Sequence, residues 1–208
     1  MISDKDSLPS YNWIEPVEIA GEDQPALPKG FSKAVWSLVL RRFPEVAQNH
    51  EVWERFINPR LAYIGRPFEM PGVEAASQRI INTINEGGEI VVFGDFDCDG
   101  VTATAILVDT IKVCGGKVTH FIPMRSEGYG LSEGAVARCL AQVKPSLLIT
   151  VDCGIGAGEA LQGILNQGIE VIVSDHHLPG APLPKECTVV STHSEGVPET
   201  CKNLCGAG

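Results

Sequence analysis

A repeated alternation of apolar runs and helical stretches most constrains what this 208-residue chain can fold into. Runs rich in Val and Ile are each followed by a turn containing Gly or Asp and then by a stretch with helical spacing, and they occupy residues 89–94, 117–122, 147–151 and 169–174, with a fifth run at 188–191. Continuous apolar runs that alternate with helices are typical of parallel strands buried on both faces. The sequence therefore predicts an α/β fold with a doubly wound, mostly parallel five-stranded sheet and helices on both faces.

The first 86 residues lack this alternation. Residues 1–29 combine prolines with acidic side chains and offer little periodic apolar surface, so we expect a loosely ordered N-terminal arm. Apolar residues then recur at helical spacing within 31–39 and 46–57, and residues 73–86 form a further helical stretch that two glycines end. We therefore expect the arm, a small helical N-terminal region over 30–86, and the sheet domain over 87–208.

Charge and composition narrow the classes of protein to consider. The net charge of −10 disfavours a protein that coats nucleic acid with its whole surface, because phosphate would be repelled at long range. A site that holds divalent cations would still attract phosphate locally. The seven cysteines are odd in number, no signal-peptide pattern opens the chain, and no apolar run is long enough to span a membrane. We therefore expect a cytoplasmic protein with no membrane partner.

Acidic residues and histidines follow three of the expected strands at the point where each strand ends. Residues 94–100 read GDFDCDG, residues 152–154 read DCG, and residues 175–177 read DHH. Because ligands of such sheets bind beyond the carboxyl ends of the strands, we expect these side chains to gather along one rim. The set comprises Asp95, Asp97, Asp99, Asp152, Asp175, His176 and His177.

A cluster of this composition requires an electrostatic explanation. Carboxylates held within a few ångströms of one another repel, and some of them take up protons unless a cation shares the site. Mg²⁺ and Mn²⁺ prefer carboxylate oxygen, whereas imidazole shifts the preference toward Mn²⁺, Fe or Zn²⁺. A two-metal centre that activates water and stabilises charge on a phosphoryl oxygen is the economical hypothesis.

Each motif taken alone also has an ordinary structural interpretation. DxDxDG resembles part of a calcium-binding loop, although the twelfth position of that loop is Ile106 here instead of glutamate. An aspartate after a strand, such as Asp152, is often a turn former or a helix cap. The occurrence of all three motifs at strand ends is what favours a metal site.

These motifs resemble those of a known family. GDFDCDGVTATAIL, VDCGIG and SDHHLPG resemble the first three motifs of the DHH phosphoesterases, and IPMRSEGYGLS is similar to the RecJ-type single-strand exonucleases of that family. The upstream stretch from Trp36 through the helix near Ile80 is also similar to these exonucleases. The resemblance covers most of residues 31–190 and implies a DHH phosphoesterase domain that uses Mn²⁺ or Mg²⁺, with two ions in the complete enzyme.

The resemblance also implies metal ligands at matching positions. These ligands would be Asp97, Asp99, Asp152 and His176. Asp152 would bridge the two ions, and Asp95 would support the catalytic centre or share in metal binding.

The remaining implied roles concern the substrate and proton transfer. His177 would contact the scissile phosphate or orient the leaving group, and Asp175 would fix a histidine tautomer. Arg125, in the loop after the second strand, could bind a phosphate bidentately, but an ordinary solvated loop arginine fits the sequence equally well.

Two features depart from the family pattern. Family members usually show an Asn-Pro pair after the fifth strand, where this chain reads STHS at 191–194. The chain ends at LCGAG, where the family would continue into a fourth motif with another aspartate ligand and a glycine-rich substrate-binding domain. We therefore expect a truncated domain with weak or no activity, and an exposed edge through which two chains could dimerise.

Three functions remain open on the sequence alone. The first is RecJ-like 5′–3′ hydrolysis of single-stranded DNA, which would bring DNA repair or replication proteins as partners. The second is hydrolysis of pyrophosphate, cyclic dinucleotides or very short oligonucleotides by the same chemistry. The third is a non-catalytic binding module that retains the DHH core, which the missing fourth carboxylate favours and the intact acids and histidines disfavour.

Two smaller groups of residues leave alternatives open. His193, Cys201 and Cys205 could form a zinc site, although their spacing and ligand count are incomplete. Trp36, Trp53 and Phe56 could stack on bases, although their helical spacing is more typical of core residues.

Overall fold

The computed structural model describes residues 26–44, 49–60, 63 and 65–208. The chain divides into two compact units, one ending at Tyr63 and the other beginning at Ile64. Most of the expected arm, residues 1–25, lies outside the described residues. None of the helices in the described ranges has the length and apolar character needed to cross a membrane.

The first unit contains two short helices, α1 (Lys33–Arg42) and α3 (His50–Ile57). Each begins at a residue whose side chain accepts hydrogen bonds from backbone N–H groups of the first turn. Ser32 accepts from Val35, and Asn49 accepts from the N–H groups of the first turn of α3. These caps satisfy donors that the helix itself leaves without partners, and they define where each helix starts.

Two tryptophans form the small core of this unit. The rings of Trp36 and Trp53 meet edge to face with their centroids 5.1 Å apart, and both side chains are buried together with Val39. Val35 and Leu38, two of the periodic apolar positions, are instead exposed. The tryptophans are therefore core residues, and they are not available to stack on bases.

The second unit is built on a five-stranded sheet in which every pairing is parallel. The strands are β1 (Glu89–Phe93), β2 (Lys117–Phe121), β3 (Leu147–Val151), β4 (Glu170–Asp175) and β5 (Thr188–Ser191). Their order across the sheet is β2-β1-β3-β4-β5. This confirms the predicted α/β architecture, and each observed strand lies within one residue of a predicted apolar run.

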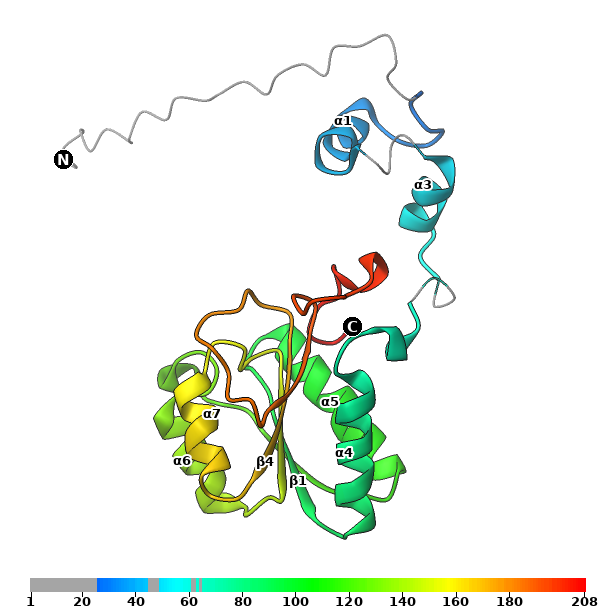
Figure 1. Ribbon diagram of the computed structural model, residues 1–208. Coiled ribbons are helices and arrows are strands. Elements are labelled where there is room, and N and C mark those ends of the chain that lie inside the picture. Colours follow the sequence, from blue (N-terminus) through cyan, green and yellow to red (C-terminus); the bar gives the residue numbers. More distant parts are fainter. Residues whose placement is uncertain (1–25, 45–48, 61–62, 64) are drawn as a thin grey trace, which may run out of the picture. The chain divides into compact units, whose positions relative to one another are not determined.

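Helices cover both faces of this sheet (Figure 1). They are α4 (Val73–Asn85), α5 (Cys98–Val113), α6 (Glu133–Gln142) and α7 (Gly158–Leu165). Helices α4 and α5 pack on one face, and α6 and α7 pack on the other. Helix α4, which we grouped with the N-terminal helices on the sequence, thus packs against the sheet.

Alternating side chains of each strand supply the two cores. In β1, Ile90 and Val92 belong to the cluster that contains Ala103 of α5, whereas Val91 and Phe93 belong to the cluster on the opposite face. All four β1 residues are fully buried. Because both faces of the strand are covered, the sequence of the strand is a continuous apolar run with no polar alternation.

Short 3-10 turns lie outside the sheet and its helices. They are η2 (Pro67–Glu69) before α4, η3 (Arg125–Glu127) after β2 and η4 (Glu199–Cys201) after β5. The segment η3 matters for the site, because it leads from the carboxyl end of β2 into α6.

Candidate metal centre

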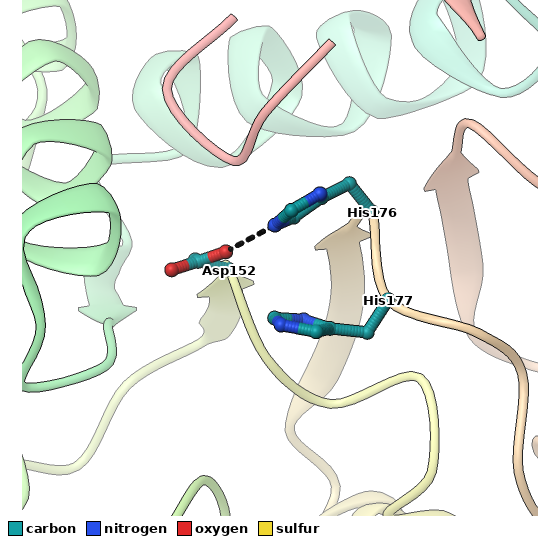
Figure 2. Close-up of side chains that lie close together, drawn as sticks. All are labelled: Asp152, His176 and His177. Atoms are coloured by element: carbon teal, nitrogen blue, oxygen red, sulfur yellow. Dashed lines mark ion pairs between the residues drawn. The ribbon is translucent and has the colours of Figure 1, made fainter. Parts of the chain in front are cut away.

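Three loops that are distant in the sequence meet at the carboxyl edge of the sheet. Strand β3 lies between β1 and β4, so the turns that follow these three strands become neighbours. Figure 2 shows Asp152, from the turn after β3, beside His176 and His177, from the turn after β4. The strand order thus converts three separate motifs into one site.

The turn after β1 places two aspartates against the start of α5. Asp97 is the N-cap of α5, and its side chain accepts a hydrogen bond from the backbone N–H of Gly100 at 3.0 Å. Asp95 is fully buried. A side chain at Gly100 would stand only 2.6 Å from the backbone nitrogen of Asp95, so glycine is what allows the helix to begin so close to this carboxylate.

The turn after β3 holds Asp152 in an unusual backbone conformation. Its φ is +60°, which makes it the only residue other than glycine with a left-handed backbone among the described residues. The backbone N–H of Asp152 donates to the carbonyl oxygen of Ser174 at 2.9 Å, and the carbonyl oxygen of Asp152 accepts from the hydroxyl of Tyr129 at 3.1 Å. Such conformations persist where surrounding contacts hold them, and they cluster at functional sites.

The turn after β4 fixes one of the two histidines. Asp175 Oδ1 lies 2.7 Å from His177 Nδ1 and accepts from the His177 backbone N–H at 3.1 Å. Asp175 Oδ2 accepts from the backbone N–H of Ile155 at 2.9 Å. Because a carboxylate can only accept, Nδ1 of His177 carries the proton of this hydrogen bond. Asp175 thus has the geometry expected for a residue that sets a histidine tautomer.

Potential ligand atoms form two overlapping groups. Ligand atoms of Asp95, Asp97 and Asp152 lie within 4.8 Å of one another, and so do those of Asp152, His176 and His177. Asp152 belongs to both groups, which is the arrangement expected of a residue that bridges two ions. Of the other expected ligands, His176 lies in the second group and Asp97 in the first.

Several oxygens in these groups have no hydrogen-bond partner. Both carboxylate oxygens of Asp95 and Oδ1 of Asp152 are buried without one in the described part of the chain. His176 Nε2 lies 3.0 Å from Asp152 Oδ1 as an ion pair, but the two atoms are not aligned for a hydrogen bond. Buried carboxylates are costly unless they are paired or coordinate a metal. The donor set therefore fits a divalent cation.

The remaining expected ligand, Asp99, is held by a segment that sequence analysis did not associate with the site. Asp99 Oδ2 and Oδ1 accept from the backbone N–H groups of Gly206 at 2.7 Å and Ala207 at 2.8 Å. Burial raises the pKa of Asp99, but these two hydrogen bonds, together with one from the Cys205 side chain and the charge of His176, outweigh it and keep the pKa below its usual value. Asp99 lies outside both ligand groups, with Oδ2 3.5 Å from His176 Nε2.

There is no room for a side chain at position 206 of this segment. A side chain at Gly206 would stand 2.6 Å from Asp152 Oδ1. Only glycine can therefore pass so close to the shared carboxylate. The pattern LCGAG contains the necessary residue, but nothing in its spacing indicates which aspartate it approaches.

Asp152 is the electrostatic centre of the site. Burial and the negative charges of Asp99 and Asp97 together raise its pKa to about 6, although the two histidines lower it. A carboxyl group that resists ionisation among other carboxylates is stabilised in its charged form by a nearby cation. The raised pKa of Asp152 and the buried oxygens without hydrogen-bond partners therefore both indicate that this site suits a cation.

Comparison with known proteins identifies the family. The family model described as "DHH family, N-terminal domain" matches residues 89–208, which is more than half of the chain. The chain belongs to the DHH family. The match spans all three loops of the candidate metal centre, so the site is part of the DHH domain.

Curated relatives of this DHH domain are named single-stranded-DNA-specific exonuclease RecJ. The protein from Bacillus subtilis (strain 168) is 35% identical over 175 residues, which cover 84% of this chain and 22% of the relative. The protein from Escherichia coli (strain K12) is 37% identical over 142 residues, which cover 67% of this chain and 24% of the relative. The chain thus spans about a quarter of the length of these relatives.

Solved structures agree with the fold. A crystal structure of exonuclease RecJ bound to manganese has a TM-score of 0.61 and 37% identity, covering 72% of this chain and 37% of that one. RecJ from Thermus thermophilus in complex with Mn²⁺ has a TM-score of 0.58 and 33% identity, covering 82% of this chain and 24% of that one.

The loop after β2 brings Arg125 toward the DHH centre. The Arg125 guanidinium lies over the ring of Phe96, 4.6 Å from its centroid, and its side chain is exposed. Glu127, in the same 3-10 turn, forms a two-point contact with Arg138 of α6 at 2.6 and 2.9 Å. This pair ties the turn to the helix, and it holds the pKa of Glu127 at about 2.

Cavity volume by itself does not locate the DHH centre. A cavity of about 200 Å³ adjoins Asp175 and His176, whereas a larger one of about 830 Å³ lies between α6 and α7 and contains none of the expected site residues. The chemistry of the side chains is therefore the better guide to the site.

The suggested zinc site is not assembled. Neither ligand group in the described residues contains His193, Cys201 or Cys205. His193 Nε2 instead lies 3.1 Å from the carbonyl oxygen of His176. His193 therefore supports the backbone of a site histidine.

Proposed function

We propose that this DHH domain holds divalent cations, Mn²⁺ or Mg²⁺, and hydrolyses single-stranded DNA in the 5′–3′ direction as a RecJ-like exonuclease. The observation that carries the proposal is Asp152, a buried carboxylate shared by two groups of ligand atoms and left with an oxygen that has no hydrogen bond. When bound, the cations would lower the pKa of water and stabilise charge on a phosphoryl oxygen.

The two ligand groups assign the metal-binding roles. Asp95 and Asp97 would hold one ion together with Asp152, and His176 would hold the other together with Asp152. We assign Asp99 to the side of His176, because its Oδ2 is 3.5 Å from Nε2 of the His176 ring.

His177 and Asp175 would serve the scissile bond. With Nδ1 held by Asp175, the Nε2 atom of His177 is left to contact the scissile phosphate or to give a proton to the leaving oxygen. The Asp175 carboxylate stabilises the ring when it becomes charged, because it already accepts its hydrogen bond.

Arg125 would bind a phosphate of the substrate. Its guanidinium rests on Phe96, and no carboxylate of the described chain pairs with it, so its N–H groups are available. A planar guanidinium matches two phosphate oxygens at once. The names of the relatives, which specify single-stranded DNA, support nucleic acid as the substrate.

Hydrolysis of a 5′-labelled single strand tests this function. We expect Mn²⁺-dependent release of nucleotides from a single-stranded oligonucleotide, little release from the corresponding duplex, and loss of release in Asp152→Asn. Asp109→Asn, an exposed aspartate on α5, is the matched control and should retain activity. Faster turnover of pyrophosphate or a cyclic dinucleotide than of DNA would contradict the proposed substrate.

Metal binding is measured separately from turnover. We expect calorimetric titration with Mn²⁺ to show binding that Asp152→Asn abolishes and Asp109→Asn leaves unchanged. The absence of both heat and thermal stabilisation at millimolar Mn²⁺ would contradict the metal centre itself and would favour a non-catalytic binding module.

A further inference from the structure

Tyr129 lies outside the three acidic motifs, yet its hydroxyl reaches the middle of the site. The residue follows η3, in the loop that leads into α6. Its hydroxyl donates to the backbone carbonyl oxygen of Asp152 at 3.1 Å. The same oxygen lies 3.2 Å from Nδ1 and 3.2 Å from Nε2 of His177. One hydroxyl thus touches both the shared aspartate and the second histidine.

The equal distances define where this hydroxyl sits. An oxygen in the plane of the imidazole and equally far from both nitrogens would collide with the ring carbon that lies between them. The Tyr129 oxygen must therefore lie over the face of the His177 ring, and the two aromatic rings are indeed nearly perpendicular at 81°. The hydroxyl blocks rotation of the imidazole in the direction of Tyr129.

Tyr129 is itself held in place. Its ring meets that of Phe96 edge to face, with centroids 6.4 Å apart and planes at 87°. Its hydroxyl is fixed by the hydrogen bond that it donates to the carbonyl oxygen of Asp152. The Tyr129 hydroxyl therefore has a defined position from which it can restrain the His177 ring.

We infer that Tyr129 is a positioning residue for His177, holding the face of the imidazole while Asp175 holds its edge through Nδ1. The inference rests on the proposed function, because it gives Tyr129 a purpose in presenting Nε2 of His177 to a phosphate. Without the hydroxyl, the His177 ring keeps its hydrogen bond to Asp175 and its contacts with the rings at positions 129 and 176, but it loses the polar contact over its face. The carbonyl oxygen of Asp152, in its left-handed turn, also loses a donor.

Tyr129→Phe removes only the hydroxyl and keeps the aromatic ring against Phe96. The matched control is Tyr63→Phe, an exposed tyrosine of the other unit. The chain has five histidines, so nitrogen NMR of the imidazole rings in metal-free protein is tractable, and His177→Gln identifies the signals of His177. We expect one protonation pattern for His177 in the starting protein and broadened or doubled His177 signals in Tyr129→Phe, with a melting temperature lowered by no more than about 2–4 °C.

Catalysis offers a second measurement. Since one hydrogen bond of ordinary strength is lost, we expect kcat on single-stranded DNA to fall about 3- to 10-fold with little change in KM. Tyr63→Phe should change neither the ring signals nor kcat.

The outcomes separate this inference from the proposed function. Unchanged His177 signals in Tyr129→Phe overturn the inference, and a fall in kcat with unchanged signals means that Tyr129 acts on the substrate directly, which also overturns it. If the His177 signals change but the chain releases no nucleotide from DNA, the positioning role stands and the exonuclease function fails.

Discussion

Asp152 and His176 face each other across two neighbouring strands, with Asp152 Oδ1 3.0 Å from His176 Nε2 (Figure 2). The pairing of Val151 with Ser174 in parallel strands β3 and β4 brings the residues that follow them together. Because the two atoms are close but not aligned for a hydrogen bond, their arrangement suits two ligands of one ion.

Asp152→Asn should stabilise the metal-free protein. The folded-state pKa of Asp152 is raised from 3.8 to about 6, so the ionised carboxylate destabilises the fold increasingly as the pH rises through this window and fully above it. Asparagine removes the charge and tolerates a left-handed backbone. At pH 7 with chelator we expect the melting temperature to rise by roughly 2–4 °C, with the gain shrinking toward pH 4.

The same variant should lose its response to metal. In the starting protein, Mn²⁺ at about 100 times its dissociation constant should contribute about 2.7 kcal/mol to stability, because it binds only the folded state. Asp152→Asn should show no such increase in melting temperature. A variant that is less stable than the starting protein in chelator would contradict the assignment of Asp152 as a repelled carboxylate.

Gly100→Ala should destabilise the domain, because its new Cβ would lie 2.6 Å from the Asp95 backbone. Overpacking of this kind costs about 1–3 kcal/mol in the free energy of unfolding, and displacement of Asp95 should also weaken Mn²⁺ binding. The control is Gly163→Ala, in α7, where nothing lies within 4 Å and where alanine should stabilise the helix by about 0.5–1 kcal/mol. Chemical denaturation measures both, and equal effects would contradict the steric argument.

Glu127→Gln should reveal a pH-dependent contribution of the Glu127–Arg138 pair. The folded-state pKa of Glu127 is lowered from 4.5 to about 2, chiefly by the hydrogen bond from Arg138, so its contribution is full above 4.5 and is lost as the pH falls toward 2. We expect the variant to be less stable at pH 7 and to approach the starting protein at pH 3. Denaturation curves measure this, with the exposed Glu195→Gln as control. A stability difference that does not change with pH would count against the pair.

His193→Ala should weaken metal binding without touching a ligand. His193 Nε2 lies 3.1 Å from the carbonyl oxygen of His176 and supports the turn that carries this histidine. Loss of one such hydrogen bond should reduce Mn²⁺ affinity by about 3- to 10-fold in calorimetry. His120→Ala, on the exposed side of edge strand β2, should leave the affinity unchanged. An unaltered affinity in His193→Ala would show that the contact has no influence on His176.

Local patterns were sufficient to predict the elements of the sheet domain. The apolar runs, the glycines and the acids that follow them are properties of short segments, and strands β3 and β5 begin and end where these runs do. The parallel arrangement of the strands could also be predicted, because the apolar runs show no polar alternation and helical stretches separate them. The resemblance to the DHH family was equally available, since it depends on motifs that are continuous in the chain.

The sequence by itself therefore determined the α/β class, the strands and the three motifs at their ends. Only the tertiary structure decided that β3 lies between β1 and β4, that Gly206 passes beside Asp152, and that the Tyr129 hydroxyl reaches the face of His177. These contacts join segments far apart in the chain, and they depend on strand order and loop conformation. Hydrophobic periodicity records which side chains are buried, but it does not record which distant loops they bring together.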